Sequence, residues 1–424
     1  MKVLIISYYW PPAGGPGFQI WLNFVKYLTV FDIDPIVFIP ENPSYPIIDE
    51  YVTSEVAPKI TVLKHKIFEP YQFASVLSNK KTKAISSGLI KEEKQSFMER
   101  LLLYIRGNFF IPDARKFWVK PSVKFLQEYL SKNSIDIIIS TGPPHSLHLI
   151  GLQLKQQLDI RWIADFRDPW TTIGYHDRLK LSSKSKKKHR KLESQVLNQA
   201  DDILVTSPST KKEFELLTQK PITVITNGFD DLTLTKTQLD KKFSCSHIGS
   251  LLAKRNPIVL WEVFAEIIQE NPSFKEDFEL NLIGKVSAEI VASIEKAGLK
   301  EHLNLFGYVS HEEARDYQMT SQVLLLIEID AAYAQCIIPG KLYEYMQSGR
   351  PIIGLGPEKA DFKQIINETN TGFTFNYNEK ERLKKTVFNL YQSYKENNLN
   401  SSSIGIQQYH RKSLTEKLAE LLKK

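Results

Sequence analysis

The feature that most constrains the fold is a pattern that runs through the chain twice. A short apolar segment is followed by a loop rich in glycine or polar residues, and then by a segment of helical length. Residues 3–7, the first such segment, are apolar at almost every position. A strand without polar alternation is typical of a parallel sheet covered by helices on both faces. The pattern therefore predicts an α/β protein with two Rossmann-like, doubly wound domains.

A polar segment at residues 231–242 separates the two runs of the pattern, and the chain of 424 residues is too long for one ordinary core. We therefore expect an N-terminal domain over residues 1–235 and a C-terminal domain over residues 236–404. The final residues, 405–424, contain an amphipathic pattern, and we expect them to form a helix that packs back on the N-terminal domain.

The net charge of +7 is unevenly distributed, because residues 178–191 carry eight Lys or Arg and no acidic residue. Such a run suits anionic partners, namely nucleic acid, acidic lipid or phosphorylated small molecules, although a solvated basic loop explains it equally simply. Residues 106–121 interleave aromatic and basic side chains, as a membrane surface or a loop folded onto its own domain would require. No nucleic-acid-binding motif accompanies them, so we do not expect nucleic acid as a partner.

The cysteine content and the apolar runs limit the compartment. Cys245 and Cys336 permit at most one disulfide, which favours a reducing cytoplasm. The apolar run at the N-terminus is too short for a signal peptide, and no run approaches the roughly 18 apolar residues that would span a bilayer.

Residues 338–354 form a candidate phosphate site. A Pro-Gly turn precedes a predicted helix over residues 341–347, and residues 351–354 then suit a buried strand. Gly340 permits close approach of a ligand, Lys341 adds a cation at the start of the helix, and Glu344 shares a helix face with it. This arrangement could hold a nucleotide by its diphosphate and ribose. A helix–strand connection with a surface ion pair is the simpler alternative.

The N-terminal half places further polar groups where predicted strands end. Gly14 and Gly15 follow the first strand, and His145 follows the strand over residues 135–140. Arg167 and Asp168 follow a strand near residue 162, with a satisfied ion-pair network as the alternative explanation. Ligands of doubly wound folds bind at such strand ends.

Four motifs in order give the chain a resemblance to the family-4 retaining glycosyltransferases of the GT-B fold, in which two domains face a central cleft. The motifs are the Gly14-Gly15 loop, residues 226–230 (Thr-Asn-Gly-Phe-Asp), residues 247–257, which contain Gly-Ser and a downstream Lys-Arg, and the segment around Glu344. The resemblance implies transfer of a sugar from a nucleotide-sugar donor to a glycan or lipid-linked acceptor.

The resemblance also assigns roles to residues. The expected donor-binding residues are Gly14, Gly15, Gly249, Ser250, Lys254, Arg255, Gly340, Lys341, Leu342 and Glu344. The expected catalytic residues are His145, Arg167, Asp168 and Arg255. Lysine and arginine beside the diphosphate make a metal unnecessary, so we expect neither a metal nor another cofactor. His145 and His148 share a helix face, but no third zinc ligand accompanies them.

One position departs from the family pattern. The family's first motif glutamate stands eight residues before the second, and here Cys336 occupies that position, with Glu328 and Asp330 out of register. The chain keeps the Pro-x-Lys-Leu-x-Glu-Tyr pattern of branches that build surface polysaccharides. Two other functions stay open at this point: a nucleotide-sugar epimerase, and a non-catalytic nucleotide-sugar-binding or scaffold protein.

The basic and aromatic runs add a prediction about location. We expect a cytoplasmic protein that associates peripherally with an anionic membrane surface, on the inner face of the plasma membrane, where a lipid-linked acceptor would be available.

Overall fold

A computed structural model describes all residues of the chain except 15–18, 47, 49–59, 70–96, 175 and 232–237. It divides the chain into two compact units, residues 1–226 with 411–424, and residues 227–410. The first crossing between the units lies at residues 226–227, before the polar segment that we expected to join the domains, and part of that segment lies outside the described residues.

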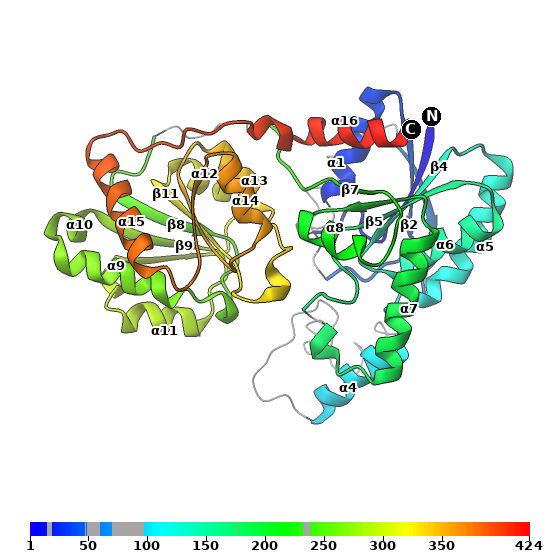
Figure 1. The fold of residues 1–424 in the computed structure, drawn as a ribbon, viewed down its shortest axis with the longest axis horizontal. Helices are drawn as coiled ribbons and strands as arrows, with labels where there is room; N and C mark the ends of the chain where they lie inside the picture. The colour runs from blue at the N-terminus through cyan, green and yellow to red at the C-terminus, as the bar shows by residue number, and fades with distance from the viewer. Residues whose placement is uncertain (15–18, 47, 49–59, 70–96, 175, 232–237) are drawn as a thin grey trace. The chain divides into compact units, whose positions relative to one another are not determined.

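The N-terminal unit contains a sheet of seven described strands, all parallel, in the order β3-β2-β1-β4-β5-β6-β7 (Figure 1). Its strands are β1 (Lys2–Ile6), β2 (Asp34–Pro40), β3 (Thr61–His65), β4 (Ile137–Gly142), β5 (Arg161–Phe166), β6 (Asp202–Val205) and β7 (Ile222–Val224). Its α-helices are α1 (Gln19–Leu28), α4 (Phe97–Phe109), α5 (Lys116–Lys132), α6 (Ser146–Gln157), α7 (Ser183–Gln199), α8 (Pro208–Glu215) and α16 (Arg411–Leu422).

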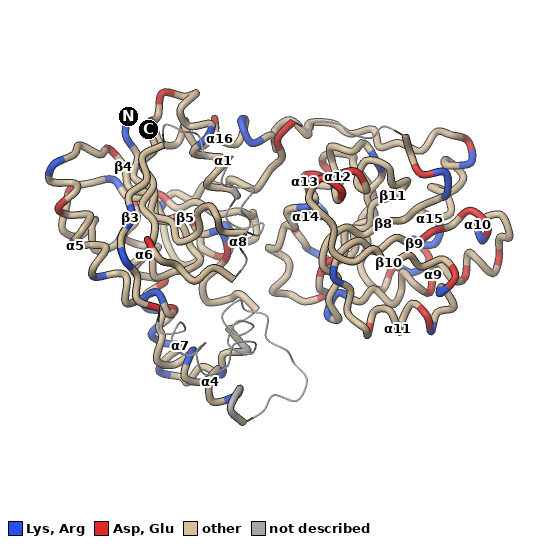
Figure 2. The backbone as a smooth tube through the Cα atoms, turned by 180° about the vertical axis from the view of Figure 1, so that it is seen from behind, with Lys and Arg blue, Asp and Glu red and all other residues tan. Residues whose placement is uncertain are grey.

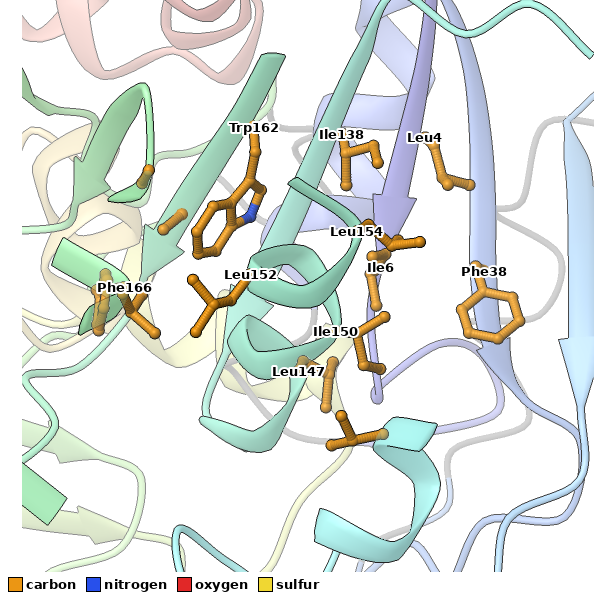
Figure 3. Packing of buried hydrophobic residues seen from close by; sticks show 14 of the residues in the cluster. Leu4, Ile6, Phe38, Ile138, Leu147, Ile150, Leu152, Leu154, Trp162 and Phe166 are labelled. Carbon is orange, nitrogen blue, oxygen red and sulfur yellow. The ribbon is translucent and has the colours of Figure 1, made fainter. Parts of the chain in front are cut away.

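Alternate residues of β1 face opposite sides of the sheet, as the pleat of a strand requires. Leu4 and Ile6 join a cluster with buried residues of α5, α6 and α7, whereas Val3 and Ile5 join one with buried residues of α1 and α16. Figure 3 shows the leucines and isoleucine of α6 beside the strand residues of the first cluster. Helices therefore cover both faces, which explains the almost unbroken apolar sequence of the strand.

The C-terminal unit repeats the architecture with six described parallel strands in the order β10-β9-β8-β11-β12-β13. Its strands are β8 (Phe243–Ile248), β9 (Phe278–Ile283), β10 (Leu303–Gly307), β11 (Val323–Ile327), β12 (Ile352–Leu355) and β13 (Gly372–Phe375). Its α-helices are α9 (Ile258–Glu270), α10 (Pro272–Asp277), α11 (Ala288–Lys296), α12 (His311–Thr320), α13 (Lys341–Gln347), α14 (Asp361–Glu368) and α15 (Lys380–Lys395). Both units are doubly wound α/β folds, as predicted.

The last helix returns to the first unit. Helix α16 packs against α1, and Leu414, Leu418 and Leu422 are buried in the cluster that also contains Val3 and Ile5. Arg161 of β5 donates hydrogen bonds to the carbonyl oxygens of Leu421 and Leu422. These carbonyls at the end of α16 have no partner within the helix, so the arginine satisfies them and fixes the helix end.

Three sequence expectations are resolved by the fold. The basic run at residues 178–191 is not simply a loop, because Ser182 caps α7 and most of the run lies inside that helix. Cys245 and Cys336 are both free cysteines, so no disulfide joins them. Within the described residues, none of the helices combines the length and the apolar character needed to cross a bilayer.

Candidate active site

A glycine and a lysine meet at the carboxyl end of β8. Gly249 follows the strand with a φ of 115°, a conformation that side chains rarely adopt. A Cβ atom built there would lie 2.8 Å from the Nζ atom of Lys341, the first residue of α13. The backbone conformation therefore favours glycine, and the absence of a Cβ atom lets the lysine end lie close to the chain.

The ammonium group of Lys341 lies in surroundings that disfavour its charge. Its Nζ atom is 3.1 Å from Nε2 of His247, whose Nδ1 lies 3.0 Å from the Leu325 carbonyl oxygen. If Nδ1 donates to that carbonyl, Nε2 is free to accept from the lysine. Burial of the ammonium, together with the positive charge of Arg255, lowers the pKa of Lys341 to about 7, against a weaker opposite effect of Glu328 and Glu344. The group is thus close to its midpoint at neutral pH and would gain charge beside an anion.

Arg255, at the end of a short 3-10 helix (Ala253–Arg255), is oriented by a buried carboxylate. Its Nε and Nη2 atoms donate to the two oxygens of Glu328 at 2.9 and 3.1 Å, and the Glu328 side chain is 1% exposed. The arginine side chain itself is 29% exposed. The bidentate pair fixes the guanidinium plane while part of the group stays accessible.

Glu344 lies one turn along α13 from Lys341 and is held by the neighbouring helix α12. Gln318 donates to its Oε2 atom at 2.7 Å, and Nε2 of His311 lies 3.6 Å from Oε1. Burial acts to raise the pKa of Glu344, but the hydrogen bonds from His311 and Gln318 outweigh it, so the pKa is lowered. The result is an ionised, partly exposed carboxylate suited to accepting hydroxyl groups.

The other expected donor-binding residues of the C-terminal unit have more varied positions. Ser250 and Lys254 are exposed in the loop after β8. Gly340 is the N-cap residue of α13 and has helical dihedral angles, which any residue could adopt, so only the absence of a side chain distinguishes it here. Leu342 is fully buried in the core, so its contribution is to pack α13 against the sheet rather than to contact a ligand.

In the N-terminal unit, His145 lies between β4 and α6 and is 3% exposed. Its ring stacks on Trp170 with a centroid distance of 4.8 Å and an interplanar angle of 3°. Neither ring nitrogen has a hydrogen-bond partner among the described residues. Burial lowers the pKa of His145 well below its usual value, with His148 as a smaller cause, so the ring is neutral.

Arg167 and Asp168 follow β5 directly, as expected. The backbone N–H of Arg167 donates to the Gly142 carbonyl at 2.8 Å, which places it beside the end of β4. Its Nη1 atom donates to Asp165 at 3.3 Å. Asp168 is half-buried, and burial raises the pKa of its carboxyl group, although Arg167 partly opposes this. A carboxylate of this kind can exchange a proton closer to neutrality than an exposed one.

The glycine-rich loop after β1 is only partly described. Gly14 is half-buried directly after Ala13, which pairs with Ile48 in an isolated bridge. Gly15 lies outside the described residues. Cys336, at the position of the family's first motif glutamate, is half-buried, and its Sγ atom lies 3.6 Å from the Tyr333 carbonyl oxygen.

Contacts between distant segments complete the site in ways that sequence motifs do not reveal. Gln318 orients Glu344 from another helix, and the Tyr345 hydroxyl accepts a hydrogen bond from the Ile248 N–H at 2.9 Å, which ties α13 to the end of β8. His247 and Glu328 were visible as motif neighbours, but nothing in their spacing indicated Lys341 and Arg255 as partners. The described residues contain no group of three or more His, Cys, Asp or Glu arranged to hold a metal ion.

Two family models match successive parts of the chain. Residues 87–231 match the model described as Glycosyltransferase Family 4, and residues 242–393 match the model described as Glycosyl transferases group 1. The chain is a glycosyltransferase of the GT-B fold. Among curated proteins, no sequence matches this glycosyltransferase.

Solved structures agree with that fold over almost the entire length of the glycosyltransferase. Anabaena HepE in complex with UDP-glucose matches with a TM-score of 0.61 at 13% identity, covering 100% of this chain and 99% of that chain. A mutant of S. aureus TarM in complex with Fondaparinux, α-GlcNAc-glycerol and UDP matches with a TM-score of 0.60 at 12% identity, covering 100% of both chains. WaaG, a glycosyltransferase involved in lipopolysaccharide biosynthesis, matches with a TM-score of 0.54 at 12% identity, covering 99% of both chains. At such identities these likenesses show the fold alone.

The lowered pKa of Lys341 predicts a stability difference that depends on pH. Between a folded pKa of about 7 and an unfolded value of about 10.4, the unfolded state binds more protons, so this lysine makes the fold more stable as pH rises. We expect Lys341→Met to melt at a higher temperature than the parent at pH 7, by about 2–4 °C for each kcal/mol gained in the free energy of unfolding. This difference in melting temperature should become smaller towards pH 10. Calorimetric scans without nucleotide measure this.

Lys359→Met serves as the matched control, because it removes the same charge from an exposed position in the same unit. If the melting temperatures of Lys341→Met and the parent differed by the same amount at every pH, the ammonium would not be destabilised by burial.

Proposed function

We propose that this glycosyltransferase retains the anomeric configuration and transfers a sugar from a nucleotide-sugar donor to a glycan or lipid-linked acceptor in cell-surface polysaccharide synthesis. The observation that carries the proposal is the grouping of Lys341, Arg255 and Glu344 around the carboxyl end of the C-terminal sheet. Two cations and an ionised carboxylate at one strand edge suit a diphosphate and a ribose, respectively.

The donor half of the proposal follows from charge. Lys341 is near half protonation in the free protein, and a diphosphate beside it would stabilise the ammonium form. Arg255 is already oriented by Glu328, and no hydrogen bond joins its Nη1 atom to another described residue. Glu344 keeps Oε2 on Gln318, and we propose that a ribose hydroxyl donates to Oε1, which lies 3.6 Å from Nε2 of His311 in the free protein. The structures of HepE with UDP-glucose and of TarM with UDP favour a uridine nucleotide as the first donor to test.

The chemistry we propose needs no protein nucleophile. The bond between the anomeric carbon and the diphosphate oxygen breaks, and the acceptor hydroxyl forms its new bond on the same face of the sugar. The hydroxyl proton passes to the departing phosphate. Charge grows on the diphosphate in the transition state, so Lys341 and Arg255 lower the barrier more than they strengthen ground-state binding. We propose a reaction without a metal because these cations supply the required charge.

The N-terminal unit supplies the groups that we assign to the acceptor. Asp168 has a carboxyl group with a raised pKa at the end of β5, and His145 has two unpaired ring nitrogens at the end of β4. We assign orientation of the acceptor hydroxyl to Asp168, with neutral His145 as a donor or acceptor to the transferred sugar. The TarM complex with α-GlcNAc-glycerol, and the involvement of WaaG in lipopolysaccharide biosynthesis, support an acceptor in cell-surface glycans.

A surface of the N-terminal unit supports peripheral binding to an anionic membrane. We call it the aromatic–basic surface. Its exposed apolar side chains are Phe97, Leu101, Tyr104 and Phe109 of α4 and Phe117 of α5. Its exposed basic side chains are Lys184, Lys186, Lys187, Lys188, Arg190 and Lys191 of α7.

The two components of this surface are held together. Asn108 of α4 accepts a hydrogen bond from the Ser182 N–H, at the cap of α7, and donates one to the Lys180 carbonyl. Figures 1 and 2 show α4 beside the N-terminal part of α7. Burial and the nearby charge of Lys188 lower the pKa of Lys116, which shows that cations of α5 and α7 lie close together. Rings that enter the headgroup layer beside clustered cations suit the inner face of a plasma membrane.

The first prediction from the proposed function concerns Arg255. We expect Arg255→Gln to lower kcat/KM for the nucleotide-sugar by about 10²–10³-fold, because it removes a charge that acts on the departing diphosphate. Arg255→Lys keeps the charge but not the bidentate geometry and should lose less. Steady-state assays of donor hydrolysis and transfer, with NMR of the product anomer, provide the measurement.

Lys296→Gln, an exposed substitution on α11, is the control. Three results would contradict the proposal: an inverted product anomer, isomerised donor without acceptor, or nucleotide binding with neither hydrolysis nor transfer. The second would indicate an epimerase and the third a binding protein.

The second prediction concerns Asp168. We expect Asp168→Asn to lower kcat by about 10²-fold at saturating donor while leaving the nucleotide Kd unchanged, because the neutral amide cannot accept the charge-assisted hydrogen bond that orients the acceptor hydroxyl. The acidic limb of the pH profile should also change. Full transfer with a normal acceptor KM in this variant would eliminate the assignment.

The third prediction concerns the aromatic–basic surface. Co-sedimentation should be strong with vesicles that contain anionic phosphatidylglycerol, weak with neutral phosphatidylcholine, and reduced by salt. Substituting Lys184, Lys186, Lys187 and Lys188 by Gln should remove about 1 kcal/mol of binding free energy per residue. The control substitutes four exposed lysines of the other unit, Lys275, Lys296, Lys359 and Lys385. Equal loss in both variants would show a net-charge effect without a docking surface.

A further inference from the structure

Arg167 is a buried arginine whose backbone is fixed on both sides. Its N–H donates to the Gly142 carbonyl at the end of β4, and its carbonyl accepts from the Thr206 hydroxyl, directly after β6, at 2.9 Å. The side chain is only 8% exposed. The neighbouring strands therefore hold the guanidinium in a defined place at the carboxyl edge of the sheet.

The guanidinium is only partly satisfied. Its Nη1 atom makes one long hydrogen bond to Asp165, and that carboxylate also accepts from Trp21 Nε1 at 2.6 Å. The Nε and Nη2 atoms are buried and have no hydrogen-bond partner anywhere in the described part of the chain. Buried charged donors without acceptors are costly, so a native protein rarely keeps them without a function.

Two other arginines show what the Nε and Nη2 atoms of a guanidinium bind when they have a partner. Arg255 places its Nε and Nη2 atoms on the two oxygens of Glu328, and Arg161 places the same two atoms on one oxygen of Asp202. These nitrogens form the side of the guanidinium with two parallel N–H groups, which matches the oxygens of a carboxylate or phosphate. Arg167 has the same edge without the anion.

We propose that the Nε–Nη2 edge of Arg167 binds an anionic group of the acceptor, a phosphate or a sugar carboxylate, and so makes the enzyme selective for charged acceptors. This inference rests on the proposed function, because it assumes that the N-terminal unit binds the acceptor. The surroundings favour an anion over a neutral ligand. Asp165 offsets part of the charge, and Asp168 interacts with it through a carboxyl group whose pKa burial raises, but neither carboxylate accepts a hydrogen bond from the Nε or Nη2 atom.

The position also explains how an anion would help the reaction. Asp168, the residue next to Arg167, is the group that we assign to the acceptor hydroxyl. An acceptor held by its anion on a buried, fixed guanidinium presents its hydroxyl at a defined distance from that carboxylate. Orientation of this kind can contribute a large part of a rate enhancement.

The test uses the full chain and three probes: glucose 1-phosphate, glucuronic acid and glucose. Calorimetric titration should show binding of at least one charged probe and much weaker binding of glucose. We expect Arg167→Gln to weaken the charged probe by about 10- to 100-fold, as loss of a charge-assisted hydrogen-bond pair should. Arg167→Lys should give an intermediate loss, because lysine lacks the fixed two-donor edge. Arg382→Gln, at an exposed site on α15, is the matched control and should bind like the parent.

A parallel titration with UDP separates this inference from the proposed function. Unchanged UDP affinity in Arg167→Gln shows that Arg167 is outside the donor site, and calorimetric melting like that of the parent shows that the N-terminal unit of the variant is folded. Loss of UDP binding in both Arg167→Gln and Arg167→Lys would overturn the inference, because it would show that Arg167 acts in donor binding or in folding. Equal affinity for glucose and the charged probes, or unchanged affinity in Arg167→Gln, would also overturn it. Failure of the parent to bind any nucleotide would contradict the proposed function, while the charged probes would still decide the role of Arg167.

Discussion

A lysine ammonium that is partly removed from water determines the arrangement of the C-terminal unit. Its Nζ atom lies close to Gly249, which has no Cβ atom, and Tyr345 and the buried Leu342 help to fix α13 against the end of β8. Its lowered pKa shows that the protein does not fully compensate the charge. Helix packing, a glycine and a buried histidine thus hold an ammonium group whose charge is not fully compensated, and an anionic ligand could stabilise that charge.

Three arginines of the two units differ in whether the Nε and Nη2 atoms of the guanidinium have a hydrogen-bond partner. Arg161 and Arg255 each have a carboxylate on the Nε–Nη2 edge, and the pair formed by Arg161 lies beside the carbonyls that end α16. These pairs fix the fold or orient a group. Arg167 has the same edge buried and unfilled. Because leaving buried charged donors unpaired is costly, the contrast separates positions that serve stability from a position that serves a ligand.

Local signals predicted much of the fold, and distant contacts explain what they missed. The helices over residues 341–347 and 258–270 follow from apolar periodicity, which is a local property. A solvated loop was one explanation of the basic run at residues 178–191, because charged residues conceal a helix whose buried face consists of residues such as Ser185 and His189. Glu344 was predicted to bind the donor, but its contact with Gln318 joins two helices and leaves no spacing signal. Leu342, which was also predicted to bind the donor, is a core residue.

The substitution of cysteine at the first motif-glutamate position is compatible with the charge balance of the site. The carboxylates of Glu328 and Glu344 act to raise the pKa of Lys341, against the effects that lower it. Each of these two carboxylates already has hydrogen-bond partners. Glu328 is held in a bidentate pair with Arg255, and Glu344 accepts from Gln318. A thiol at residue 336 adds no negative charge at neutral pH. With Glu328 and Glu344 already engaged, the positive charge of Lys341 is left for an incoming diphosphate.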